Sequence, residues 1–372
     1  MTLTHSSTLK IALPSQVDPE EELVSHLVHT VSRAGICSDP ISIINFYVAL
    51  KSKPLAILAG PEQTGKIAMV QCLSRALMGG DCIQCQMMEG HPWSAAKSGN
   101  VTFFTKIHTR YNSEKLLCLI EEAWQPENSG KIFLACLTRI SPAELEEFFT
   151  EIAFQLQHGN IVRFGDVHLA EPIPFPPNLF LVGTMDTACF DWWDGDLLSN
   201  TTVIQWPEKP TDHLLCPVSG GRYPAAEKYF LRSYVHNEHA VSKKLHTLLS
   251  WKRQPVLPLF LIESLFEEEA IPLPHTLFNE ALIYLANSWS RQGSGLFHSA
   301  PADNLATAID LVIAQSYLPR CGKWIRRSNV LQEKLRELLN RNYPRAALTL
   351  AALAGESFQA ARYRTIETSS NK

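Results

Sequence analysis

The sequence has 372 residues, of which 45% are hydrophobic and 19% are charged, and its formal net charge is −4. This length allows two domains with separate cores, and the composition is that of a globular protein. The mildly acidic balance lacks the basic stripe of nucleic-acid binders, so contact with nucleic acid is expected only indirectly, if at all. Nine scattered cysteines and the lack of a long apolar run predict a cytoplasmic protein with reduced thiols that does not enter a membrane.

The first elements are expected to be a flexible leader over residues 1–17 and two helices. Asp18-Pro19 and Asp39-Pro40 each place a capping carboxylate before a proline at the first helical position. Apolar residues at helical spacing follow the first cap up to Gly35. The second helix is predicted over residues 41–51, directly before a strand.

That strand, at residues 54–59, leads into a glycine-rich loop and then into a helix closed by Gly79-Gly80. A G-x-x-x-x-G-K string between a strand and a helix predicts a phosphate-binding loop, whose amides converge on phosphate while the lysine reaches the outer phosphates. We call residues 60–67 the phosphate loop. The predicted nucleotide-binding residues are Gly60, Pro61, Glu62, Gln63, Thr64, Gly65, Lys66 and Ile67. Ile67 replaces the serine or threonine that normally ligates Mg²⁺.

Strands and helices alternate along the following stretch. Strands are predicted at 82–88, 131–137, 178–185 and 202–206, with helices at 113–124 and 142–157. This alternation predicts an α/β fold with a parallel sheet and flanking helices. The lone C-x-x-C of the first of these strands is interpreted as strand cysteines, and no metal site is expected.

From about residue 242 the pattern is almost entirely helical. Four helices are predicted, at 276–289, 304–318, 330–342 and 344–354, and the basic run at 320–327 is interpreted as a solvated helix end. The predicted organisation is therefore an α/β nucleotide-binding-like domain over 18–206, a linker or insertion over 207–240, and an all-helical domain over 241–372.

A phosphate-loop domain followed by a helical bundle resembles AAA+ proteins. Four strings resemble the McrB-like AAA+ family, the NTP-driven motor subunits of modification-dependent restriction systems: "FYVALKSKPLAILAGPEQTGKIAMVQCLSRAL", "PFPPNLFLVGTMDT", "DLVIAQSYLPRCGKW" and "NRNYPRAALTLAAL". The resemblance runs over roughly residues 20 to 360. It implies a P-loop AAA+ fold in which the C-terminal helical domain is the lid.

The same resemblance implies that the groups needed for hydrolysis are missing. Five positions carry another residue where the family has a functional one. Leu137 and Thr138 replace the acidic pair that holds Mg²⁺ and orients water, and Asp186 replaces the first-sensor asparagine. Asn200 replaces the arginine finger, and Thr276 lies about where a second-sensor arginine is expected. No Asp or Glu occurs between Lys131 and Glu144, so the loss of the acidic pair does not depend on the alignment. A carboxylate at Asp186 would repel the γ-phosphate.

We therefore expect a catalytically degenerate AAA+ protein, an assembly or regulatory subunit rather than an enzyme. It is expected to bind ATP or GTP without efficient hydrolysis, and magnesium is expected to contribute little. Expected partners are AAA+ subunits in a homo- or hetero-oligomer, or a nuclease-type subunit. One alternative is an active ATP- or GTP-hydrolysing motor subunit of a McrB-like restriction or defence system that borrows acids such as Glu121 or Glu122. Another is a structural relic in which Lys66 is merely solvated.

Overall fold

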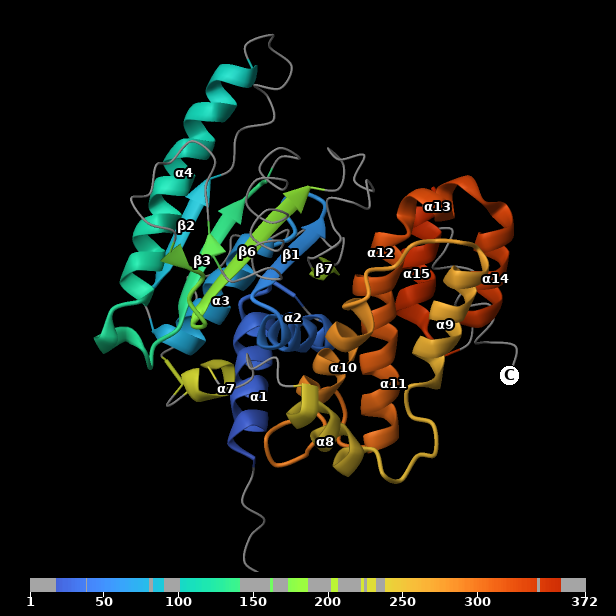
Figure 1. The fold of residues 1–372 in the computed structure, drawn as a ribbon. Coiled ribbons are helices and arrows are strands. Elements are labelled where there is room, and N and C mark those ends of the chain that lie inside the picture. Colours follow the sequence, from blue (N-terminus) through green and yellow to red (C-terminus); the bar gives the residue numbers. More distant parts are fainter. Residues whose placement is uncertain are drawn as a thin grey trace, which may run out of the picture.

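The computed structural model describes residues 18–37, 39–79, 83–89, 101–140, 161–162, 173–186, 202–206, 222–223, 226–231, 238–339 and 342–355. Within these residues the chain has an α/β fold, a parallel sheet with helices around it and a helical bundle beside it (Figure 1). The predicted leader, the predicted helix at 142–157 and most of the predicted linker lie outside the described residues. No helix in the described part of the chain is both long enough and apolar enough to cross a membrane.

Five strands form the main sheet in the order β2-β3-β6-β1-β7, and every neighbouring pair is parallel. Their bounds are β1 (Leu55–Gly60), β2 (Cys85–Glu89), β3 (Phe133–Thr138), β6 (Leu179–Asp186) and β7 (Thr202–Gln205). A separate antiparallel pair joins β4 (Ile161–Val162) and β5 (Ile173–Pro174). Every residue of β1 and β3 is buried, as expected of parallel strands covered on both faces. The predicted strands and the parallel sheet are confirmed.

Helices surround this sheet, and the two predicted N-terminal caps are present. They are α1 (Pro19–Arg33), α2 (Pro40–Ser52), α3 (Lys66–Met78), α4 (Val101–Ala123) and the short α7 (Glu227–Leu231). The Asp18 carboxylate accepts the Glu20 amide at 2.9 Å, and the Asp39 carboxylate accepts the Ile41 amide at 3.1 Å. Helix α4 begins twelve residues before the predicted start at 113. The prediction began late because the first half of α4 is rich in residues of modest helix propensity.

The bundle lies beside the β7 edge of the sheet (Figure 1). Its helices are α8 (Glu238–Leu248), α9 (Leu257–Glu268), α10 (Leu277–Asn287), α11 (Pro301–Val312), α12 (Leu318–Arg320), α13 (Gly322–Arg327), α14 (Asn329–Leu339) and α15 (Pro344–Leu353), with a π-helical turn, η5 (Ile313–Tyr317), after α11. The four predicted helices are confirmed. Helix α9 was not predicted because its mostly apolar N-terminal half, "LPLFLI", does not alternate clearly with polar residues.

The basic run after residue 319 is only partly solvated. Arg320 is 5% exposed, and its guanidinium bonds the Glu280 carboxylate at 3.0 Å, whereas Arg326 and Arg327 are exposed. The prediction of a solvated helix end is therefore wrong for Arg320, because Glu280 supplies a buried partner for its charge.

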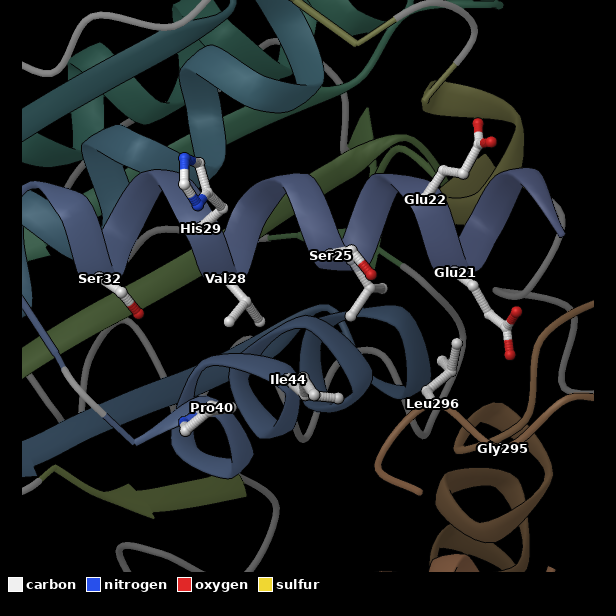
Figure 2. A pocket seen from close by; sticks show the side chains of 11 residues that line it. Glu21, Glu22, Ser25, Val28, His29, Ser32, Pro40, Ile44, Gly295 and Leu296 are labelled. Carbon is white, nitrogen blue, oxygen red and sulfur yellow. The ribbon is translucent and has the colours of Figure 1, made fainter. Parts of the chain in front are cut away.

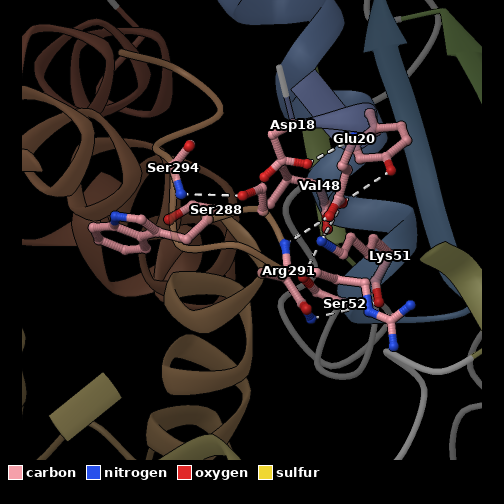
Figure 3. A network of polar contacts seen from close by, with 12 residues as sticks. Asp18, Glu20, Val48, Lys51, Ser52, Ser288, Arg291 and Ser294 are labelled. Carbon is pink, nitrogen blue, oxygen red and sulfur yellow. Dashed lines mark hydrogen bonds and ion pairs between the residues drawn. The ribbon is translucent and has the colours of Figure 1, made fainter. Parts of the chain in front are cut away.

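Buried polar contacts join the bundle to α1 and α2 (Figure 3). Lys51 pairs with Glu20, and the second carboxylate oxygen of Glu20 accepts the Arg291 amide at 3.0 Å. Tyr284 donates its hydroxyl proton to Asn45 at 2.5 Å. We call these contacts the α2 seam. Because the seam is buried, the bundle and the sheet are held together by specific partners rather than by apolar contact alone.

Candidate functional site

The candidate site lies at the carboxyl edge of the sheet, where the phosphate loop leaves β1. Gly60 is paired in register with Asp186 at the end of β6, and Leu137 of β3 is paired with Gly183 of β6. Neighbouring strands are about 4.8 Å apart. The sheet therefore brings the ends of β1, β6 and β3 together, and with them the phosphate loop, Asp186 and Thr138.

Two glycines are required by the shape of the phosphate loop. Gly65 has φ +81°, in the left-handed region, and a Cβ there would lie 3.0 Å from the Ile36 Cγ2 atom. A Cβ on Gly60 would lie 2.8 Å from the Trp206 carbonyl oxygen. The chain thus turns tightly out of β1 and into α3, with the loop pressed against neighbours on both sides.

Trp206, at the end of β7, fixes the phosphate loop and was not anticipated from the sequence. Its indole N–H donates to the Thr64 carbonyl at 2.7 Å, and its amide donates to the Ala59 carbonyl at 2.7 Å. The Thr64 hydroxyl donates to the Pro61 carbonyl at 2.9 Å. These bonds hold the loop backbone in one arrangement without a ligand.

Lys66 is folded into its own loop. Its side chain is 8% exposed, and its ammonium donates to the carbonyl oxygens of Gly60, at 2.8 Å, and of Pro61. Burial lowers the pKa of Lys66 to about 8, although the carboxylates of Asp186 and Glu62 oppose that shift. The prediction of a solvated Lys66 is therefore wrong, whereas the structural relic stays an alternative.

Helix α3 presents its first amides to the same place. The Met69 amide makes the first bond of the helix, to the Gly65 carbonyl at 2.9 Å. The amides of Lys66, Ile67 and Ala68 precede that bond, so they have no acceptor within the helix. A helix N-terminus with an ammonium beside it favours an anion. The loop is chemically suited to hold a phosphate group.

Arg139 adds a second cation, which sequence reasoning missed. It follows β3 directly, and its guanidinium Nε lies 4.0 Å from the Glu62 carboxylate, with both side chains substantially exposed. Among the described residues, three non-glycine residues have positive φ, and two of them, Gln63 and Arg139, lie at this site. The sequence contained a signal for it, because Arg139 directly follows a predicted strand and the carboxyl ends of parallel strands meet at one edge of the sheet.

The positions expected to carry the acidic pair contain no carboxylate. The Leu137 side chain is fully buried, and the Thr138 hydroxyl donates to the Met88 carbonyl at 3.4 Å. Ile67 is half-buried in the first turn of α3. Leu137 and Ile67 have no side-chain oxygen and cannot ligate Mg²⁺, and the Thr138 hydroxyl is no substitute for a carboxylate. Within the described ranges, no group of three or more His, Cys, Asp or Glu side chains is arranged to hold a metal ion.

The acids that might have replaced the missing pair lie elsewhere. Glu121 and Glu122 are in the last turn of α4, and Glu122 contacts Asn128, just before β3 begins. This places them at the amino edge of the sheet, opposite the phosphate loop. Glu89 ends β2 at the carboxyl edge, paired with Thr138. Since β2 is three strands from β1, Glu89 is at least about 14 Å from Gly60.

The remaining predicted positions are not brought to the phosphate loop by the described residues. Thr276 lies at the N-cap position of α10, and its hydroxyl donates to the Glu280 carboxylate at 3.2 Å. Glu280 bonds Lys53 at 2.9 Å, and Lys53 lies just before β1, at the opposite end from the loop. Asn200 lies outside the described residues.

A hollow of about 730 Å³ lies elsewhere, between α1, α2 and residues 295–296 (Figure 2). Ser25, Val28 and Ser32 point toward α2, whereas Glu22 and His29 point to the other side of α1. Glu21 also points to this side of α1, toward residues 295–296. The inward groups are therefore hydroxyls, aliphatic carbons and a single carboxylate, with no cation to receive a phosphate.

Comparisons with known proteins leave the family open. No protein-family model matches the chain, and no curated protein matches it.

Proposed function

We propose that the chain is a catalytically degenerate P-loop protein of AAA+ type, resembling the McrB-like family. In this proposal it binds the phosphates of ATP or GTP at the phosphate loop without efficient hydrolysis. It acts as an assembly or regulatory subunit beside other AAA+ subunits or a nuclease-type partner, in the cytoplasm, and any contact with nucleic acid is indirect.

The sheet order supports the proposal. The strand with the sensor-like string, β6, lies between the phosphate-loop strand β1 and the strand β3 of the expected acidic pair. An AAA+ site needs these three strand ends side by side. The helical bundle that follows the sheet in the chain would be the lid of such a protein.

The observation that carries the proposal is the state of Lys66. Its ammonium is buried, yet its bonds go to neutral oxygens of its own loop rather than to a carboxylate. A phosphate oxygen makes a charge-assisted bond, which is stronger than a bond to a neutral carbonyl. A phosphate can therefore replace the carbonyls as the partner of Lys66, with Arg139 as a second cation at the rim.

The missing acids argue against turnover in the same proposal. Mg²⁺ needs oxygen ligands, and the expected ligand positions hold Ile67 and Leu137. Thr138 cannot orient and deprotonate an attacking water as a glutamate does. Glu62 and Asp186 place negative charge near the phosphates, and this is expected to weaken binding rather than assist chemistry.

An active ATP- or GTP-hydrolysing motor subunit of a restriction or defence system is the second candidate. Glu89 is the observation that favours it, since this carboxylate lies at the carboxyl edge of the sheet. Its separation from β1 by two intervening strands makes it a poor metal ligand for phosphates at the loop.

Titration of the purified full-length chain with fluorescent ATP and GTP analogues, with a turnover assay in parallel, tests the proposal. Wild type should bind saturably without turnover, and Lys66→Ala should abolish binding. Lys243→Ala is the matched control, because Lys243 is an exposed lysine on α8. Steady turnover that vanishes in Lys66→Ala would favour the motor subunit, and absence of binding in wild type would contradict both candidates.

A further inference from the structure

Helix α9 lies in the bundle (Figure 1) and carries an exposed apolar strip. Leu257, Phe260 and Leu261 are 40%, 50% and 46% exposed. They make up three of the seven large hydrophobic side chains that are exposed in the described part of the chain. Such a concentration on one short helix marks a contact surface more often than scattered apolar residues do.

The exposed residues of α9 form a single stripe along the helix. They are Leu257, Phe260, Leu261, Ser264, Glu267 and Glu268, and the positions between them are buried or half-buried. Steps of three and four residues keep these side chains on one face of the helix. We call this face the α9 stripe. Its first half is apolar and its second half is acidic.

A basic pair precedes the stripe. Lys252 and Arg253 are exposed in the loop that leads from α8 to the start of α9. They lie eight and seven positions before Phe260, and Glu267 and Glu268 lie seven and eight positions after it. The basic pair thus lies before the apolar centre and the acidic pair after it, at equal separations in the sequence. Glu269, by contrast, is already paired with Lys334 at 2.6 Å.

From this arrangement we infer that the α9 stripe binds the same stripe of a second copy of the chain, antiparallel and about a two-fold axis near Phe260. In that arrangement the apolar centres meet each other. The basic pair of one copy faces Glu267 and Glu268 of the other, twice by symmetry. A two-fold interface must be self-complementary in this way, and a parallel alignment would bring like charges together.

Phe260 is pre-positioned for this contact. Its ring packs on Phe278 of α10, with the ring centroids 4.7 Å apart, while half of its surface stays exposed. An aromatic side chain held by a neighbour loses little conformational freedom on binding, which suits an interface anchor. The inference does not depend on nucleotide binding, and it concerns a surface far along the chain from the phosphate loop.

Sedimentation of the full-length chain over a range of concentrations tests the inference. Wild type should shift from monomer to dimer and stop there, and Leu261→Glu should weaken dimerisation at least about tenfold. Val330→Glu is the matched control, because Val330 is a 58% exposed residue on α14, outside the stripe. Leu261 is exposed, so its replacement should leave the melting temperature unchanged.

Charge reversal separates the antiparallel arrangement from other contacts. The pair Lys252→Glu/Arg253→Glu should weaken dimerisation, as should Glu267→Lys/Glu268→Lys. An equimolar mixture of these two variants should dimerise again, because every facing cluster is then of opposite sign. A monomer at all concentrations, dimerisation that survives Leu261→Glu, or a mixture that stays monomeric would each overturn the inference. Growth beyond a dimer that Leu261→Glu prevents would also overturn it, because a two-fold contact closes.

Discussion

Two buried lysines, Lys66 in the phosphate loop and Lys51 in the α2 seam, satisfy their charges in different ways. Lys51 is 3% exposed and pairs directly with the Glu20 carboxylate. Lys66 is 8% exposed, but its bonds go to carbonyl oxygens and to the Thr64 hydroxyl. Burial lowers the pKa of both lysines, and each has a carboxylate nearby that opposes the shift.

The difference separates a structural lysine from one that, in the proposed function, receives a phosphate. The charge of Lys51 is neutralised in place by an ion pair that also binds Arg291, so nothing further can enter. The partners of Lys66 are neutral atoms that an incoming anion can replace. In the proposed function, the Lys66 ammonium exchanges its neutral partners for a phosphate, whereas the Lys51 ammonium stays in its ion pair with Glu20.

The largest expected effect comes from breaking the α2 seam. Lys51→Met should lower the free energy of unfolding by about 3–5 kcal/mol, because it leaves the buried Glu20 carboxylate without its cation. Urea denaturation of the full-length chain measures this. The double variant Glu20→Gln/Lys51→Met should lose less than the single variant, since no uncompensated charge remains. A single variant that costs under about 1 kcal/mol would show that the pair is not structurally important.

Nucleotide affinity should fall as pH rises through about 8, the pKa of Lys66. Only the charged ammonium attracts phosphate, so above that pH binding must take up a proton, and affinity falls by up to about tenfold per pH unit. Titrations at about pH 7 and about pH 9 measure this. An affinity that stays constant between them would mean that Lys66 does not contact the phosphates.

The same lowered pKa affects stability with the opposite sign. Between about 8 and the ordinary value of 10.5, the unfolded chain binds more protons at Lys66 than the folded chain does. Stability therefore rises with pH in that window as far as Lys66 is concerned. Lys66→Ala should lack this contribution, and comparison of the two unfolding curves isolates it.

Removing the carboxylate beside Lys66 should tighten nucleotide binding. Asp186→Asn is expected to increase affinity on the order of tenfold, or ~1.4 kcal/mol, because one negative charge near the phosphates is lost. Glu62→Gln is the matched comparison. It should increase nucleotide affinity only about two- to threefold, since Glu62 is half exposed and its charge is screened by solvent. Unchanged or weaker binding in Asp186→Asn would contradict this electrostatic description of the site.

The strands and the phosphate loop could be predicted from the sequence because local patterns determine them. Hydrophobic runs gave the five parallel strands, and the Gly60 to Lys66 spacing gave the loop between β1 and α3. Contacts between distant segments could not be predicted. Trp206 reaches the loop from another strand, and Arg139 reaches it only because β3 lies two strands from β1.

Burial was the other quantity that local patterns could not supply. Lys66 follows a glycine in the sequence and Arg320 begins a basic run, so sequence alone allows a solvated position for either. Each is buried because a partner far along the chain, or the loop backbone itself, accepts its hydrogen bonds. Helix α9 shows the reverse case, since three of its seven Leu, Ile and Phe side chains are exposed.

Metal dependence tests the central claim most directly. The dissociation constant for an ATP analogue should be measured with Mg²⁺ and with EDTA, on wild type and on Ile67→Thr. We expect the two conditions to agree within about twofold for both proteins, because a threonine at 67 still lacks the carboxylate that Leu137 replaces. Binding at least about tenfold tighter with Mg²⁺ in wild type would contradict the claim, and would mean that other residues complete a metal site at the phosphate loop.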